Sequence, residues 1–301
     1  MSIGGYGPEK SAHGAGLAAL HDHVVSGSNG EVTIDVTWNI MDRGRPNTDL
    51  LELVERGRMF LCYFSTSYLG PRVSELNVLE TPFLFSDLAS AHRSLDGNLG
   101  ERLRTAVRTK TEFEALGFWD NGFRHMTNRL HPIHSPEDVR DMTVRIQPNP
   151  IHEELMRDWG ATPVAVELSE GIEMIKSGTV DAQENPLANT VAYGVHEVHP
   201  HVTMTAHLYG ARGLFANRHF YEELPDDLRL LVDEGARRGV AVQREAASKL
   251  ETELRTELED GGTVFVDLSP EERAAFEEAA TGALAMSHEL VPTDLFELVG
   301  R

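Results

Sequence analysis

The chain has 301 residues, of which 48 are acidic and 27 are basic, and its formal net charge at pH 7 is −21. This charge excludes a general binder of nucleic acids or anionic membranes, because both targets repel an acidic protein. The hydrophobic content of 41% suits one large or two medium domains, and the single cysteine, Cys62, excludes a disulfide framework and a thiolate-rich metal site. If the ligand is an anion, a few local arginines must provide the attraction that the overall charge opposes.

Helical and strand-like patterns alternate along most of the chain, which predicts an α/β architecture with largely parallel sheets. Helices are expected at about 12–25, 47–57, 87–109 and 149–159, and a further helix is expected to start at 135–138. Strands are expected at 31–38, 59–64, 114–119 and 143–147. Ser269 and Pro270 fit the N-cap and first turn of another helix, and Glu272 completes its capping box.

The segment from Pro225 to about Asp260 departs from this alternation, because it is charged and helical throughout. Its apolar stripe consists of Leu228, Leu231, Leu250, Leu254 and Leu258. A continuous helix of this length would extend roughly 50 Å at 1.5 Å per residue, enough to run along two domains. The alternative is a helix broken near Gly235 or Gly239.

No segment of about 18 apolar residues occurs, so we expect no membrane-spanning helix. The first ten residues, MSIGGYGPEK, lack the charged and apolar regions of a signal peptide. We therefore expect either a cytosolic protein or an exported protein whose signal peptide has been removed.

Motifs of the common enzyme classes are missing: there is no G-x-S-x-G, no P-loop and no H-E-x-x-H. His196, His199 and His201 lie together in HEVHPH, but Pro200 interrupts any helix that would place them on one face. We interpret them as surface and capping histidines near a helix end. The sequence therefore predicts no catalytic residue, no metal site and no cofactor.

Three arginines lie in apolar or structured surroundings. Arg145, in TVRIQ, shares a strand face with Thr143 and Gln147, and a charge within a sheet is costly without a partner. Its planar guanidinium can bind a ligand carboxylate through two parallel hydrogen bonds. The alternative is a structural salt bridge to an acidic residue of the chain. The same two interpretations apply to Arg124 in NGFRHMTN. Arg212, between two glycines in HLYGARGLF, is expected at the rim of a cleft.

Several segments occur in the order expected of one family. They are GYGPEKSAHG (5–14), TPFLFSD (81–87), NGFRHMTNR (121–129), PIHSPEDVRDMTVRIQ (132–147), GATPVAVELSEGIEMIKSGTVDAQENPL (160–187) and FYEELPDDL (220–228). The chain thus resembles the extracytoplasmic solute-binding proteins of tripartite ATP-independent periplasmic (TRAP) transporters. The most specific part of this resemblance is the block from Arg145 to Pro186.

The resemblance implies a two-domain, periplasmic-binding-protein-like (Venus flytrap) α/β fold with a long helix spanning both domains. Domain I would comprise 1–122 and about 213–250, and domain II 123–212 and about 251–301, with the ligand cleft between them. It favours a continuous helix from about 226 to 260. It also implies a protein without enzymatic activity.

The resemblance also implies a set of substrate-binding residues. Arg145 would pair with the substrate carboxylate, Asn185 would add an amide hydrogen bond and Arg124 a second basic contact. Asp181, Gln183 and Glu184 would brace the hinge and orient the arginines. The remaining expected contacts are Arg212, Tyr209, Tyr6, Ser65, Ser67, Tyr68 and Gln147.

Function and partners follow from the same resemblance. The protein is expected to capture a small organic acid by an arginine clamp and domain closure, and to deliver it to the membrane subunits of a TRAP permease. We expect a monomer that is periplasmic, or exported and tethered to the membrane. A ligand-binding sensory module for a receptor or kinase is one alternative, and a metalloenzyme using the histidines is another.

Overall fold

The computed structural model describes residues 1–299, which pack as two compact units. The first unit contains 1–66, 100–120 and 211–250, and the second contains 67–99, 121–210 and 251–299. Residues 67–99 therefore pack with the second unit, whereas the boundaries expected from the sequence placed them in domain I. The chain passes from one unit to the other within β4 (Phe113–Asn128), β8 (His201–Asn217) and α9 (Asp226–Asp260).

The sheet of the first unit is built around a fully buried strand. This strand, β3 (Leu61–Ser65), contains most of the predicted strand 59–64. The parallel strand β1 (Ser2–Gly4) separates it from β2 (Asp35–Thr37), and the last residues of β8 pair with it in antiparallel fashion. The other elements of this unit are α1 (Ala12–Gly27), η1 (Ile40–Arg43), α2 (Asp49–Glu55), α4 (Asn98–Lys110) and α8 (Arg218–Glu222).

In the sheet of the second unit, β5 (Thr143–Ile146) lies one strand from the edge. Strands β6 (Thr162–Ala165) and β7 (Ala182–Asn185) flank β5 in parallel, and β7 pairs with β4 in antiparallel fashion. Strand β9 (Val264–Val266) runs parallel to the first residues of β8. The helices are η3 (Ser74–Glu80), α3 (Leu88–Asp96), η4 (Pro136–Val139), α5 (Pro150–Asp158), α6 (Leu168–Ser177), α7 (Leu187–Ala192), η5 (Val195–Glu197), α10 (Pro270–Ala279), α11 (Thr281–Leu290) and α12 (Thr293–Phe296); η2 (Thr66–Leu69) begins at the boundary between the units.

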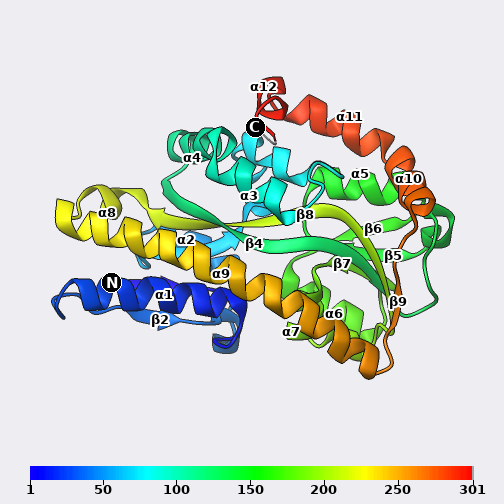
Figure 1. The fold of residues 1–301 in the computed structure, drawn as a ribbon, viewed down its shortest axis with the longest axis horizontal. Helices are drawn as coiled ribbons and strands as arrows, with labels where there is room; N and C mark the ends of the chain where they lie inside the picture. The colour runs from blue at the N-terminus through cyan, green and yellow to red at the C-terminus, as the bar shows by residue number, and fades with distance from the viewer. Residues whose placement is uncertain (300–301) are drawn as a thin grey trace. The chain divides into compact units, whose positions relative to one another are not determined.

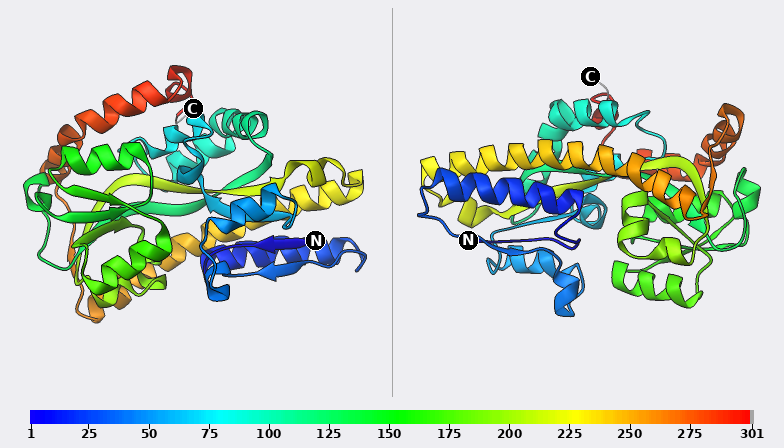
Figure 2. Two further views of the ribbon diagram at one scale, coloured as in Figure 1. Left: turned by 180° about the vertical axis from the view of Figure 1, so that it is seen from behind. Right: turned by 60° about the horizontal axis from the view of Figure 1, so that its bottom comes forward.

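The α/β class is confirmed, and the antiparallel pairs arise where the two long strands β4 and β8 join otherwise parallel strands. Helix α9 is continuous over 35 residues (Figures 1 and 2), so it is not broken at Gly235 or Gly239. Within the first unit, a Cβ on Gly239 would lie 2.9 Å from the Gly16 carbonyl oxygen of α1. This glycine therefore permits close helix packing. None of the helices within residues 1–299 is both long and apolar enough to cross a membrane.

Two predicted helices differ from the structure. The segment 87–109 forms two helices, α3 and α4, because Gly97 leaves the helical conformation with φ −100° and ψ −152°. The segment 135–138 forms only the short 3₁₀ helix η4, although Ser135 and Asp138 make a capping box. It ends because Arg140 is extended, with ψ 136°, and Asp141 adopts a left-handed φ of 64°.

Candidate functional site

Arg145 lies in the middle of β5, in the second unit, and its side chain is only 2% exposed. Its neighbours Val144 and Ile146 belong to the hydrophobic core of this unit. Since side chains alternate along a strand, Arg145 points to the opposite face of the sheet. Its partner across the sheet is Gln183 of β7, and Asn185 lies two residues further along β7 on the same face. Register and alternation thus bring Arg145 and Asn185 to one face of the sheet.

The hydrogen bonds that Arg145 makes within the chain go to neutral oxygens. Its Nη2 donates to the carbonyl oxygen of Val166 at 2.9 Å, and its guanidinium also donates to the Tyr68 hydroxyl. Its Nε is buried and has no hydrogen-bond partner within residues 1–299. Burial raises the pKa of Tyr68, and the charge of Arg145 opposes that rise. Arg145 is therefore a buried cation whose Nε–H donor has no acceptor among residues 1–299.

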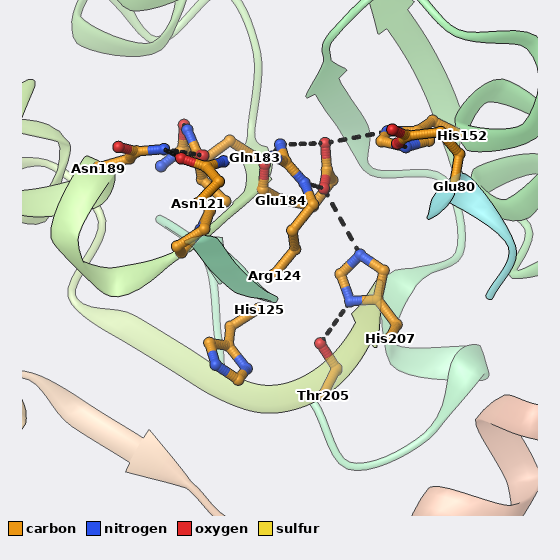
Figure 3. A network of polar contacts seen from close by, with 12 residues as sticks. Glu80, Asn121, Arg124, His125, His152, Gln183, Glu184, Asn189, Thr205 and His207 are labelled. Atoms are coloured by element: carbon orange, nitrogen blue, oxygen red, sulfur yellow. Dashed lines mark hydrogen bonds and ion pairs between the residues drawn. The ribbon is translucent and has the colours of Figure 1, made fainter. Parts of the chain in front are cut away.

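Arg124, at the second-unit end of β4, has the opposite environment. Its Nε and Nη2 both donate to the carboxylate of Glu184, and Nη2 also donates to the Glu184 carbonyl oxygen at 2.7 Å (Figure 3). The two side chains are 2% and 0% exposed. Burial by itself would raise the pKa of Glu184, but the charge of Arg124 and the nearby His152 hold it well below its ordinary value. The sequence left open whether Arg124 makes a structural salt bridge or binds a ligand carboxylate, and this ion pair is such a salt bridge. As a ligand contact, Arg124 stays a prediction.

The ion pair continues into a larger buried network in the second unit (Figure 3). His152 of α5 lies 3.6 Å from Glu184 through Nδ1 and 2.7 Å from Glu80 of η3 through Nε2. Burial disfavours the charged imidazole, but its contacts with Glu184 and Glu80 raise the pKa of His152 overall. His207 is 3.6 Å from Glu184, and burial lowers its pKa to about 4. Glu80, His152 and His207 could not be predicted from the sequence, because nothing in their spacing links these distant segments.

Amide side chains form a second network beside the ion pair. Asn189 Nδ2 donates to Asn185 Oδ1 and to Asn121 Oδ1, both at 2.9 Å, and Gln183 Nε2 donates to Thr190 Oγ1 at 3.1 Å. All five side chains are buried. Asn185, the predicted ligand contact, is therefore held in a defined orientation by its neighbours.

The two acidic residues of the segment 181–186 make separate contacts. Glu184 orients Arg124, in agreement with the prediction for that residue. Asp181 instead accepts hydrogen bonds from the backbone N–H of Thr143 at 2.9 Å and from its hydroxyl at 2.6 Å, so it connects β5 to the start of β7.

The first unit holds Arg212, Tyr6 and Ser65. The guanidinium carbon of Arg212 lies 4.5 Å from the centre of the Tyr6 ring and 5.5 Å from that of Tyr63, in cation–π geometry. Arg212 is paired with Ser65 inside β8 and is 2% exposed, and its position at the rim of a cleft stays a prediction. The two glycines on either side of this arginine, Gly210 and Gly213, also lie within β8.

The backbone of the amino-terminal glycine-rich loop passes close to an aromatic ring at Gly5. A Cβ on Gly5 would lie 2.1 Å from the ring of Tyr63. The Tyr63 hydroxyl also accepts a hydrogen bond from the backbone N–H of Tyr6 at 3.1 Å.

The other predicted contacts lie in the second unit. Tyr209 packs edge-on against Phe85 and Phe123, with ring centres 5.4 and 5.7 Å apart. The buried hydroxyl of Ser67 has no hydrogen-bond partner among the described residues, and Gln147 is buried just after β5. The second unit thus holds Arg145, Tyr68, Asn185, Gln147, Ser67, Tyr209 and Arg124.

One of the three histidines of HEVHPH differs from the prediction, whereas His196 and His201 are partly exposed. His199 is fully buried rather than at the surface, and its Nδ1 lies 3.0 Å from Thr127 Oγ1. Burial lowers the pKa of His199 to about 4. Within residues 1–299, no group of three or more His, Cys, Asp or Glu side chains is arranged to hold a metal ion.

His199 should make stability depend on pH. With a pKa near 6.5 when unfolded and about 4 when folded, it takes up a proton only in the unfolded state as the pH falls through this range. We therefore expect the free energy of unfolding to fall between pH 6.5 and 4, by up to about 3 kcal/mol from this residue. Urea unfolding from pH 7 to 4 should show a shallower decline for His199→Gln than for the wild type, and an unchanged one for the exposed His219→Gln. Parallel curves for wild type and His199→Gln would refute the assignment.

Comparison with known proteins agrees with this arrangement. The family model "bacterial extracellular solute-binding protein, family 7" matches residues 3–289. The chain belongs to this family. The resemblance to TRAP solute-binding proteins is therefore confirmed, and so is the two-domain fold class that it implied.

Three similar proteins illustrate the match. The C4-dicarboxylate-binding periplasmic protein DctP of Rhodobacter capsulatus is 29% identical over 270 residues, covering 89% of this chain and 80% of that protein. A TRAP solute-binding protein of Polaromonas sp. JS666, solved with D-erythronate, has a TM-score of 0.93 at 25% identity, covering 100% of this chain and 97% of the other. One from Sulfurospirillum deleyianum, solved with succinate, has a TM-score of 0.92 at 25% identity, covering 99% and 97%.

Proposed function

We propose that this family 7 protein is the extracytoplasmic component of a TRAP transporter and captures a small organic acid through Arg145. The observation that carries the proposal is the buried guanidinium of Arg145, which binds neutral oxygens and keeps a donor without a protein partner. A buried guanidinium with such donors suits a carboxylate, which accepts two parallel hydrogen bonds. The ligands named for relatives, which include C4-dicarboxylate, D-erythronate and succinate, are all carboxylates.

The other predicted contacts fit the remainder of such a ligand. We propose that Asn185, Tyr68, Ser67, Gln147, Tyr209 and Arg124 contribute from the second unit, and Arg212, Tyr6 and Ser65 from the first. Charge-assisted hydrogen bonds contribute about 1.5–3 kcal/mol each. Two bonds from Arg145 with amide and apolar contacts are enough for micromolar binding, about −8 kcal/mol, after the cost of association.

Closure of the two domains over the ligand would complete capture and give the permease subunits a defined shape to recognise. The protein then acts in the periplasm, as a monomer. The sensory alternative has no specific observation in its favour, because the named relatives are binding proteins of TRAP transporters or of C4-dicarboxylates.

A thermal-shift screen tests the proposal. Purified protein is heated with succinate, D-erythronate or D-galacturonate, and with erythritol as an uncharged polyol. An acid at one hundred times its dissociation constant should stabilise the protein by about 2.7 kcal/mol, without being consumed. Equal stabilisation by erythritol, or no shift with any organic acid in an extended library, would contradict the proposal. A stronger shift with succinate than with the monocarboxylates would indicate that a second arginine, such as Arg212, binds the far carboxylate.

A further inference from the structure

Arg145 packs against a helix at a position that has no side chain. Gly171 is the fourth residue of α6, in the second unit. A Cβ built on Gly171 would lie 2.4 Å from Arg145 Nε, 2.9 Å from Cδ and 3.0 Å from Cγ. Ordinary contacts of a Cβ begin at 3.4 Å, so any side chain at 171 would displace the guanidinium by about 1 Å.

The hydrogen bonds of Arg145 fix the same position. The Val166 carbonyl that accepts from Nη2 immediately precedes Glu167, the N-cap residue of α6. The guanidinium therefore rests against the first turn of the helix backbone, and the hydrogen bond that it donates to the Tyr68 hydroxyl completes its support. A displacement of about 1 Å would lengthen the 2.9 Å bond to Val166 beyond the range of a good hydrogen bond.

Helix conformation does not explain this glycine. Gly171 is not among the glycines with a left-handed φ, and its N–H makes a regular helical bond to Glu167 at 2.8 Å. Inside a helix glycine is a much weaker helix former than alanine. The space that Gly171 leaves is occupied by Arg145, and that space is the physical reason for a glycine here.

We propose that Gly171 is a positioning residue: it sets the depth of Arg145 in the site and so the place of the ligand carboxylate. This inference rests on the proposed function, because it assumes that Arg145 binds the acid. Gly171 itself need not touch the ligand. Alanine at 171 would push the fork away from Val166 and misalign both of its hydrogen bonds to a carboxylate, since such pairs depend strongly on geometry.

A double-variant cycle tests the inference, with D-erythronate and succinate as probes and binding followed by calorimetry and thermal shift. Gly171→Ala should weaken binding of the better probe at least about tenfold, the loss of one charge-assisted bond. The melting temperature without ligand should stay the same or rise, because alanine favours the helix. Glu173→Ala, on the exposed side of the same helix, should leave binding unchanged.

The cycle is completed with Arg145→Ala, whose side chain lacks the Cγ, Cδ and Nε atoms that a Cβ at 171 would meet. In this background Gly171→Ala should change binding less than about twofold, because interacting residues are not additive. Equal losses in both backgrounds, or unchanged binding in Gly171→Ala while Arg145→Ala weakens it, would overturn the inference alone. Wild-type protein that binds neither these probes nor any acid of the extended library would overturn the proposed function, and the inference with it.

Discussion

Arg145→Ala is expected to weaken binding of the organic acid at least about 100-fold and to leave the fold intact. The ligand carboxylate would be buried without its cation, and two charge-assisted hydrogen bonds of about 1.5–3 kcal/mol each would be lost. The fold should tolerate the change because, among residues 1–299, the hydrogen bonds of Arg145 go to neutral oxygens. Isothermal titration calorimetry measures the loss, and circular dichroism checks the fold.

Two further variants test whether binding requires the guanidinium group and whether it requires an arginine at this position. Arg145→Lys keeps the charge but loses the planar fork, so its affinity should lie between those of wild type and Arg145→Ala. Arg140→Ala removes an exposed arginine shortly before β5 and should bind like the wild type. If Arg145→Ala bound the acid as tightly as Arg140→Ala, Arg145 would not be the carboxylate contact.

Glu184→Gln is expected to reduce the free energy of unfolding by about 3–5 kcal/mol, because removing one partner of a buried ion pair leaves the other charge uncompensated. Arg124 would lose its carboxylate, and His152 would keep only Glu80 as an acidic neighbour. Urea unfolding at pH 7 measures this change.

The matched control is Glu153→Gln, which removes the partner of Arg157 from an exposed pair at 2.8 Å in the same unit. Exposed pairs of this kind contribute about 0–1 kcal/mol. A loss in Glu184→Gln no larger than in Glu153→Gln would show that the buried network does not stabilise the protein. Replacing both Arg124 and Glu184 by apolar residues should recover part of the loss, since neither charge is then left unpaired.

The two predictions follow from one contrast between neighbouring arginines. Arg124 has a carboxylate partner inside the protein, so its charge is used for stability. Arg145 is equally buried, yet its partners are a carbonyl and a phenol, so its charge remains available. Since the chain carries a net charge of −21, such local cations must provide the attraction for an anionic ligand.

Local patterns were sufficient for much of the fold. Alternation over residues 143–147 placed Arg145 inside a strand, opposite the core residues Val144 and Ile146, and the structure agrees. The leucine stripe of 225–260 predicted a long helix, and α9 is continuous. These features depend on neighbours a few residues apart, which the sequence shows directly.

Contacts between residues far apart in the sequence could not be predicted in the same way. The sequence left open whether Arg124 has an acidic partner, and its 48 acidic residues gave no means of choosing Glu184, which lies 60 residues away. The closeness of Gly171 to Arg145 depends on how α6 packs over the sheet, and no local pattern encodes it. At 136–139 a local signal was present but misleading. The capping box of Ser135 and Asp138 predicted the start of an α-helix, and only a short 3₁₀ helix follows it.

The most direct test of the central claim compares an acid with its own primary amide. The acid that gives the largest thermal shift is titrated calorimetrically into wild-type protein beside the amide, which keeps the size and polarity but lacks the charge. We predict micromolar binding of the acid, about −8 kcal/mol, and at least about 100-fold weaker binding of the amide. Equal affinity for acid and amide would contradict recognition of a carboxylate by Arg145.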